Sequence, residues 1–421
     1  MWFKVIVAKD IAIIRGVSAA IFAISLSFLN IYFFERGYSM AYVGLITGIS
    51  TIVGSAMRIP SGLLSDILGP SRVLISGIFL RGFALVMIAV FMYYDFDLIW
   101  FFPLLLLNSA AFSFLITSSN SIISLYFREL DLTRALSIVR VGINIGFSVG
   151  PLIGGFISEF SFPLLFLISG VLSFVLLIFV IKIKNKIDGE IAKSRNLGKK
   201  VSFRDVFSPI LDAQFLILLL FVFFGGVIIS QFLNSLPVIA KDQNFSNRQI
   251  GFFFTQNGFF VIILQIPLIK FIMKFFINDD IKIGEEVINN NNISSRKISA
   301  VFLGLLLYVV AFNFFGFYQS FAWYSFCVFI LTLGEIIFQT FSMDLAMNFA
   351  PKDKKGTYLG FFEFSEAIGW SIGKYFGGFV FDLFHHEPKK FWFIVSLPAL
   401  PAFLLIFVFR IFTNKRNESR N

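Results

Sequence analysis

The stretch Phe160-Ser-Phe-Pro-Leu-Leu-Phe-Leu-Ile-Ser-Gly-Val-Leu-Ser-Phe-Val-Leu-Leu-Ile-Phe-Val-Ile181 carries no charged side chain. A run of about 18 apolar residues is long enough to cross a lipid bilayer as a helix. Similar runs recur along the 421 residues, of which 57% are apolar and only 14% are charged. Soluble domains carry about 25% charged residues, so most of this chain does not face water. The composition therefore predicts an all-α membrane protein.

The apolar runs and the polar connections between them predict twelve membrane spans. These spans cover residues 11–34, 41–66, 72–94, 97–127, 134–158, 160–182, 212–238, 248–275, 297–317, 320–349, 356–380 and 391–412. With the N-terminus in the cytoplasm, the cytoplasmic segments hold 25 Lys and Arg residues and the opposite connections hold five. Because cytoplasmic loops are enriched in Lys and Arg, we expect a multi-pass protein of the cell inner (plasma) membrane with both termini cytoplasmic.

The net charge of +10 has the same origin. In a soluble protein such a charge would suggest a nucleic-acid partner, but here the basic residues follow the predicted topology. Basic connections beside a membrane also attract anionic lipid headgroups. We therefore expect the lipid bilayer as a partner and no nucleic acid.

Several kinds of chemistry are disfavoured by what the sequence contains. Cys327 is its single cysteine, and its two histidines, His385 and His386, are adjacent. Neither type is arranged with metal-ligand spacing, and a Gly-x-x-x-x-Gly-Lys-Ser/Thr nucleotide loop does not occur. We expect no metal, no cofactor and no enzymatic activity.

The two halves of the chain resemble each other in two motifs that recur in the same order. Ser39-Met-Ala-Tyr-Val-Gly44 recurs as Ser246-Asn-Arg-Gln-Ile-Gly251. The pattern Gly146-xxx-Gly150-Pro-x-x-Gly154-Gly155 recurs from Gly369 to Gly378 at a somewhat longer spacing, and the additional length is placed in the Asn-rich connection 276–296. A duplicated six-helix unit is typical of alternating-access transporters, whose substrate site lies between the repeats near mid-membrane.

The longest polar connection separates these halves. We expect a six-helix bundle over residues 1–183, a cytoplasmic linker over 184–211 and a second six-helix bundle over 212–421.

A polar turn between the second and third spans reads Gly62-Leu-Leu-Ser-Asp66-Ile-Leu-Gly69-Pro-Ser-Arg72. Its glycines permit a tight turn, and Asp66 and Arg72 can join a charge network that differs between two states. The turn resembles the cytoplasmic-loop signature of the major facilitator superfamily. This resemblance covers nearly the whole chain and implies two pseudo-symmetric six-helix bundles with a cytoplasmic gate at Gly62, Asp66, Gly69 and Arg72. We expect the chain to act as a monomer.

The fifth predicted span carries Gly146, Gly150, Pro151, Gly154 and Gly155. It is similar to the fifth-helix motif of proton-coupled exporters of the superfamily, where this motif is taken to seal a leak pathway. The residues themselves also fit ordinary close helix packing. The copy departs from the family pattern, because Ser137 stands where an upstream glycine is usual. Many such exporters also carry a basic residue inside the fourth span, and this sequence has none there.

Several charged residues lie inside predicted spans, and intramembrane charges mark functional sites by default. Glu335 and Gln339 share one face of a helix, whereas Asp344 lies half a turn away and is expected to be structural. We expect Glu335, Glu366 and Glu363 to couple protons, since a carboxyl group in a low-dielectric cavity can exchange protons near neutrality. Buried ion pairing is the alternative. The intramembrane charge partners available for it are Arg15, Arg58, Arg81, Arg140 and Lys374.

The predicted function is secondary active transport, with proton-coupled export of small hydrophobic or amphipathic compounds by alternating access. The expected partners are therefore a small-molecule substrate and protons. Polar residues expected to line the substrate cavity are Asn30, Gln231, Asn234 and Gln339. The alternative is a proton symporter or facilitator for uptake of a small metabolite.

Overall fold

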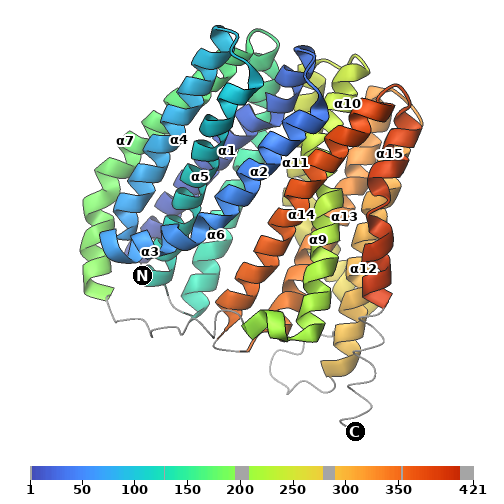
Figure 1. Cartoon of the computed structure of the whole chain (residues 1–421). Coiled ribbons are helices and arrows are strands. Elements are labelled where there is room, and N and C mark those ends of the chain that lie inside the picture. The colour runs from blue at the N-terminus through green and yellow to red at the C-terminus, as the bar shows by residue number, and fades with distance from the viewer. Residues whose placement is uncertain (1, 128, 195–207, 278–289, 352–353, 408–421) are drawn as a thin grey trace. The chain divides into compact units, whose positions relative to one another are not determined.

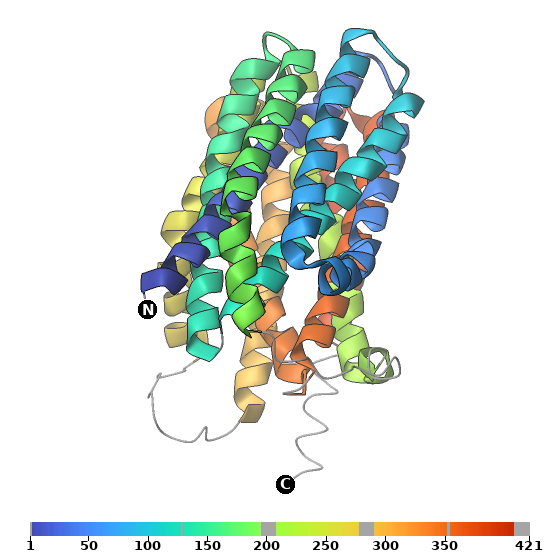
Figure 2. The ribbon, with the colours of Figure 1, turned by 90° about the vertical axis from the view of Figure 1, so that its left-hand side faces the viewer.

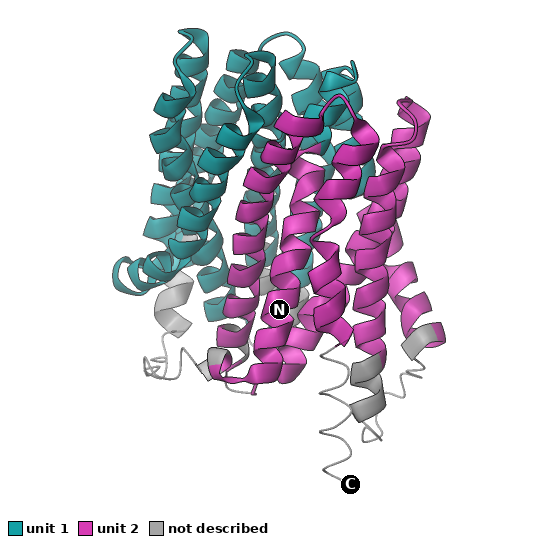
Figure 3. Ribbon diagram, turned by 45° about the vertical axis from the view of Figure 1, so that its right-hand side comes forward, with its two compact units in different colours: residues 1–198, 236–258 teal, residues 199–235, 259–421 magenta. Residues whose placement is uncertain are grey.

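The computed structural model describes residues 2–127, 129–194, 208–277, 290–351 and 354–407. In these ranges the chain forms helices joined by short turns, without a strand (Figure 1). The chain divides into two compact units (Figure 3). Unit 1 comprises Met1–Gly198 and Leu236–Gly258, and unit 2 comprises Lys199–Ser235 and Phe259–Asn421. The prediction of an all-α membrane fold is confirmed.

Most helices of unit 1 are long and run lengthwise beside one another (Figure 2). Helix α1 packs on α6, α4 packs on α5 and α7, and α2 packs on α5. The bounds are α1 Trp2–Glu35, α2 Met40–Ala56, α3 Arg58–Leu68, α4 Pro70–Tyr93, α5 Leu98–Tyr126, α6 Glu129–Ser158, α7 Phe162–Ser194 and α10 Leu236–Asp242, followed by the first half of α11 Asn247–Ile272.

Unit 2 repeats this pairing with its own helices. Helix α9 packs on α14, and α12 packs on α13 and α15. The bounds are η1 Ser208–Leu211, α9 Ala213–Asn234, the second half of α11, η2 Met273–Ile277, α12 Asn290–Phe315, α13 Phe321–Phe349, α14 Lys355–Phe384 and α15 Pro388–Ser396.

Eleven helices among the described residues are long and apolar enough to cross a membrane, and they correspond to eleven of the twelve predicted spans. The predicted span 356–380 forms the 30-residue helix α14 but does not belong to this set. Glu363, Glu366 and Lys374 make this segment less hydrophobic than the others. The long helix outside this set thus carries two of the predicted proton-coupling residues, Glu363 and Glu366.

Two predicted spans are each broken into two helices. Helices α2 and α3 meet at Met57, shortly before Pro60, and α9 and α10 meet at Ser235, shortly before Pro237. Proline has no N–H to donate to the preceding turn, so the helical ladder is interrupted at both places. The predicted linker 184–211 lies partly outside the described residues, and the domain boundaries drawn from it stay a prediction.

Candidate proton and substrate site

Helix α14 is held against α9 around Glu366. A Cβ on Gly226 of α9 would lie 2.6 Å from the carbonyl oxygen of Glu366, so only glycine permits this approach. The hydroxyl of Ser365 donates to the carbonyl oxygen of Leu219 at 2.7 Å. Close helix contacts through small residues are typical of membrane bundles. They fix the backbone from which the Glu366 side chain extends.

Helices α12 and α13 also meet through glycines. A Cβ on Gly334 of α13 would lie 2.8 Å from the carbonyl oxygen of Gly304 in α12. Toward one end of this pair, Lys297 Nζ lies 2.6 Å from Asp344 Oδ2. This ion pair favours a structural role for Asp344. The glycine contact brings the middle of α13 against α12.

Glu366 and Gln339 meet between α14 and α13. Gln339 Nε2 donates to Glu366 Oε1 at 2.8 Å, and both side chains are half-buried. Glu335 is also half-buried and lies one turn before Gln339 on the same helix face. Tyr308 of α12 is only 1% exposed and interacts electrostatically with both carboxylates. Three helices therefore bring two carboxyl groups, an amide and a phenol together midway along unit 2.

Tyr308 was missed by the sequence reasoning. A tyrosine inside an apolar run gives no charge signal, and its neighbours on α12 are apolar. The structure explains its position, because Tyr308 follows Gly304 by one helical turn and Gly304 approaches α13 closely.

The other charged residues of α14 occupy different surroundings. Glu363 is exposed, one turn before Glu366, and Lys374 is half-buried two turns after Glu366. Of the three predicted proton-coupling residues, Glu366 is the one that accepts the hydrogen bond from Gln339.

Two of the residues expected in the substrate cavity are engaged in helix packing. Gln231 is fully buried, and its Nε2 donates to the carbonyl oxygens of Val227 at 2.8 Å and Gly373 at 2.9 Å. Asn234 is half-buried and donates to the carbonyl oxygen of Ser230 at 2.7 Å. These bonds favour a packing role for Gln231 in particular.

In unit 1, the fifth-helix motif lies on α6 and has two faces. Gly155 approaches the carbonyl oxygen of Asn247, from which an added Cβ would be 2.6 Å, and Gly251 of α11 approaches that of Pro151. On the other face a glycine stands at every fourth position, and each of these glycines meets a carbonyl oxygen of α1. The facing pairs are Gly142 and Ala12, Gly146 and Gly16, Gly150 and Ala20, and Gly154 and Ile24.

Two ion pairs that were not predicted connect the segment 236–258 to the end of α1 and to Glu159, directly after α6, within unit 1. Arg248 Nε lies 2.5 Å from Glu159 Oε2, and the Arg248 backbone N–H donates to Glu159 Oε1 at 3.1 Å. Lys241 Nζ lies 2.8 Å from Glu35 Oε1. The sequence analysis placed these four residues in connections between spans. Which of them pair could not be predicted, because the pairing depends on the tertiary structure.

The predicted gate turn joins α3 to α4. Gly69 adopts φ +89°, a backbone conformation that favours glycine, and Pro70 starts α4 directly after it. The side chains of Asp66 and Arg72 are exposed, whereas Gly62 is half-buried and faces Thr117.

The basic residues of unit 1 differ in burial. Arg81 is 2% exposed, and its Nη1 donates to the Ser18 hydroxyl at 2.5 Å. Arg15 is half-buried and donates to the carbonyl oxygen of Ile116 at 3.3 Å. Arg58 is half-buried at the start of α3, and Arg140 is exposed on α6. Asn30 of α1, expected in the cavity, is 8% exposed.

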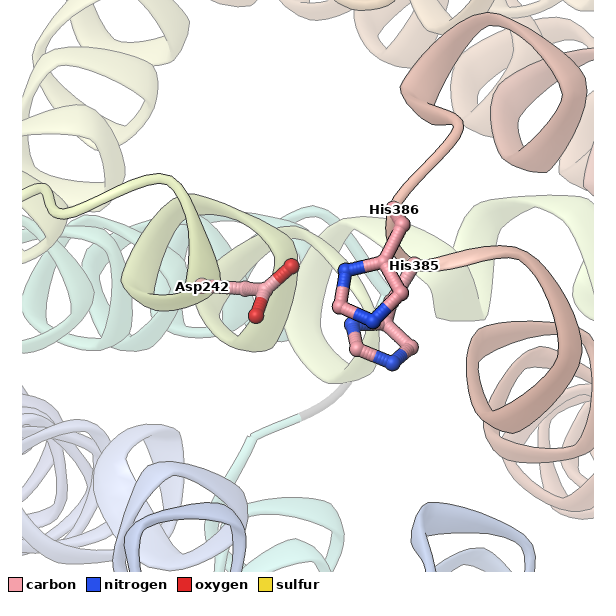
Figure 4. A group of neighbouring side chains, drawn as sticks. All are labelled: Asp242, His385 and His386. Carbon is pink, nitrogen blue, oxygen red and sulfur yellow. The ribbon is translucent and has the colours of Figure 1, made fainter.

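His385 and His386 follow α14 and have ring centroids 3.6 Å apart (Figure 4). The His385 ring also stacks on Phe381, with centroids 5.0 Å apart. Asp242, drawn in the same figure, belongs to unit 1.

Comparisons with known proteins agree with this architecture. The family model described as Major Facilitator Superfamily matches residues 11–374. A curated relative from Bacillus subtilis (strain 168), an uncharacterized MFS-type transporter YttB, is 27% identical over 158 residues. That match spans 38% of this chain and 35% of the relative, about a third of its length.

Solved transporter structures share the fold over nearly their full length. The nucleoside transporter NupG has a TM-score of 0.73 at 16% identity, covering 96% of this chain and 99% of that one. A bacterial homolog of the human lysosomal transporter Spinster has a TM-score of 0.74 at 13% identity, covering 98% of both chains. A POT family transporter in complex with 5-aminolevulinic acid has a TM-score of 0.73 at 12% identity, covering 97% of this chain and 96% of that one.

The fold and these matches define a multi-pass membrane protein with the major facilitator architecture. The chain belongs to the major facilitator superfamily.

Proposed function

We propose that this transporter is a proton-coupled exporter of small hydrophobic or amphipathic compounds that works by alternating access. We place it as a monomer in the cell inner membrane, with both termini in the cytoplasm. The observation that carries the proposal is the hydrogen bond from Gln339 to Glu366 midway along α13 and α14.

This hydrogen bond couples a proton to a helix contact. The ionised carboxylate of Glu366 accepts a charge-assisted bond from the Gln339 amide, which is stronger than a bond between neutral groups. Protonation of Glu366 removes the charge and weakens the bond, so proton uptake changes how tightly α13 holds α14. Glu335, on the same face as Gln339, and Glu363, one turn before Glu366, are further proton acceptors in this proposal.

Export, rather than uptake, is supported by the fifth-helix motif on α6, which is similar to that of proton-coupled exporters. Its glycine face against α1 and its second face against Asn247 and Gly251 are both tightly packed. In the proposal this packing closes the leak pathway, and the gate turn with Asp66 and Arg72 switches between the two access states.

The test is transport by purified protein in proteoliposomes with an imposed pH gradient. A panel of compounds with a cationic, a neutral or an anionic head group is supplied, and compound and proton fluxes are followed together. We expect at least one class to move opposite to the protons. Movement in the same direction as the protons would instead establish the uptake alternative, and flux that ignores the pH gradient would refute proton coupling.

A further inference from the structure

Arg81 lies midway along the span Pro70–Tyr93 and is one of the most deeply buried charged side chains of unit 1. Among the described residues, no carboxylate pairs with it. Nη1 donates to the Ser18 hydroxyl at 2.5 Å, and the guanidinium carbon lies 4.8 Å from the ring centroid of Phe112. Its Nε is buried without a hydrogen-bond partner. A buried charge is costly unless it is paired and hydrogen-bonded. The Ser18 hydroxyl and the Phe112 ring compensate the buried guanidinium of Arg81 only in part.

A second orphaned polar group lies on α5, which packs on α4. Asn108 of α5 is 3% exposed, and its Oδ1 has no partner. Asn108 precedes Phe112 by one helical turn, so both occupy the same face of α5. Such buried, unsatisfied groups in a native structure require an explanation, and the two arise independently on neighbouring helices.

The internal repeat gives this position a functional counterpart. A Cβ on Gly77 would lie 2.9 Å from the carbonyl oxygen of Ala111, and one on Gly304 would lie 3.0 Å from that of Gly334. The same two glycines approach the backbone nitrogens of Leu115, at 3.0 Å, and of Phe338, at 2.7 Å. The pairs α4–α5 and α12–α13 are therefore equivalent at this contact.

This equivalence aligns the charged groups of the two units. Arg81 follows Gly77 by one helical turn as Tyr308 follows Gly304, and Phe112 follows Ala111 as Glu335 follows Gly334. Unit 1 thus holds a cation against an aromatic ring where unit 2 holds a phenol beside a carboxylate. Arg81 therefore corresponds to Tyr308 and Phe112 corresponds to Glu335, so the cation of unit 1 and the carboxylate of unit 2 stand on different helices of the equivalent pairs.

Next to Arg81 there is an aromatic surface. Phe22 of α1 stacks on Phe112 with centroids 5.6 Å apart, and Phe147 of α6 meets Phe22 edge-on at 5.9 Å. All three rings are half-buried and lie midway along their helices. Substrate sites of such transporters lie at this depth, and aromatic rings beside one fixed charge are typical of small-molecule sites.

We propose that Arg81, with Ser18 and Phe112, binds an anionic group of the transported compound while its apolar body rests on Phe22 and Phe147. Arginine suits this role because its planar fork matches carboxylate and phosphate groups. The substrate class is thus an amphipathic anion. The inference rests on the proposed function, because it requires that a transported compound enters unit 1.

Binding to the purified full-length protein in nanodiscs tests the inference without a proton gradient, so its failure is distinct from a failure of proton coupling. The probes are phenylbutyrate, phenylbutanol and phenylbutylamine, which share one apolar body and differ in the head group. We expect wild type to bind phenylbutyrate about tenfold more tightly than the alcohol, with the amine weakest. Equal binding of the three, or tightest binding of the amine, would overturn the proposal whatever the variants do.

Variants of Arg81 test whether this residue causes the preference for phenylbutyrate over phenylbutanol. In Arg81→Gln we expect phenylbutyrate to lose its advantage over the alcohol while alcohol binding stays within about twofold, and in Arg81→Lys we expect a partial preference. The control is Lys297→Gln, which removes a cation already paired with Asp344 in unit 2 and is expected to keep the full preference. A folded Arg81→Gln protein that still prefers phenylbutyrate about tenfold would contradict the assignment.

Discussion

Gln339 Nε2 and Glu366 Oε1 lie 2.8 Å apart and join the middles of helices α13 and α14. The contact depends on two neighbouring helix pairs, because α14 is anchored on α9 at Gly226 and α13 on α12 at Gly304. A titratable group is thereby built into a bond between two spans, which is the arrangement that proton-driven movement of helices requires.

The first prediction concerns the charge of Glu366. Glu366→Gln keeps an oxygen that can accept from Gln339 but cannot lose or gain a proton. We expect pH-gradient-driven flux to fall at least about tenfold, equivalent to about 1.4 kcal/mol, while counterflow at equal pH persists. Flux is measured in proteoliposomes with Glu387→Gln as the control, since Glu387 is half-exposed and paired with Lys390 outside the site. Loss of counterflow and driven flux together would indicate a role other than proton coupling.

The second prediction concerns the glycine stripe of α14. A Cβ on Gly369 would collide with the carbonyl oxygen of Phe223 in α9. We expect Gly369→Leu to destabilise the protein by about 1–3 kcal/mol or more through overpacking, seen as a lower melting temperature in detergent.

Gly360 offers a matched control on the same helix. A Cβ there meets nothing within 4 Å, and alanine favours a helix over glycine by up to about 1 kcal/mol. Gly360→Ala should therefore leave the melting temperature unchanged or raise it. A Gly369→Leu protein as stable as wild type would show that the α9–α14 contact is looser than the structure has it.

The third prediction separates packing from substrate contact at Gln231. Gln231→Leu would leave the Ser235 hydroxyl and the carbonyl oxygen of Gly373 without their present partner. A buried unsatisfied group costs about 1–3 kcal/mol, so we expect a lower melting temperature with unchanged ranking of transported compounds. A changed ranking at wild-type stability would return Gln231 to the substrate cavity.

The fourth prediction concerns the ion pair between Glu159 and Arg248. Glu159 accepts from both the side chain and the backbone N–H of Arg248. We expect Glu159→Ala to speed amide hydrogen exchange in the first turn of α11 by about tenfold, which corresponds to about 1.4 kcal/mol of local opening.

Charge reversal provides the check on this pair. Arg248→Glu alone should loosen the same turn, and the double reversal with Glu159→Arg should restore part of the protection, since the backbone hydrogen bond to a carboxylate is not recovered. Unchanged exchange in Glu159→Ala would mean that the apolar contacts of the segment 236–258 hold it without this pair.

Much of the fold could be predicted because hydropathy reports membrane spans directly. Eleven predicted spans correspond to apolar helices, and α14 departs from them because of the charges that it carries. The helix breaks at Met57 and Ser235 were not predicted, although Pro60 and Pro237 supply their physical cause.

The internal repeat was visible in the sequence only where motifs survive. The glycine contacts add another match, between Gly77 of α4 and Gly304 of α12. These two glycines are further apart in the chain than Gly146 and Gly369, although Gly77 precedes Gly146. One insertion in the connection 276–296 is therefore too simple an account, because the repeat spacing first grows and then shrinks along the chain.

At the candidate site, the sequence placed Glu335 and Gln339 on one face of a helix, since that relation depends on helical periodicity alone. The bond from Gln339 to Glu366 could not be predicted, because it depends on the rotation of two helices about their axes. Arg81, named among charge partners, instead lies against Ser18 and Phe112, a contact set by packing in unit 1.

Proton release on ligand binding tests the central claim most directly. A transported compound is added to the purified, weakly buffered protein, and the released protons are measured for wild type, Glu335→Gln, Glu366→Gln and the double variant. We predict that wild type releases protons and that the double variant releases none while still binding the compound. Undiminished release from the double variant would contradict a proton site built on these two glutamates.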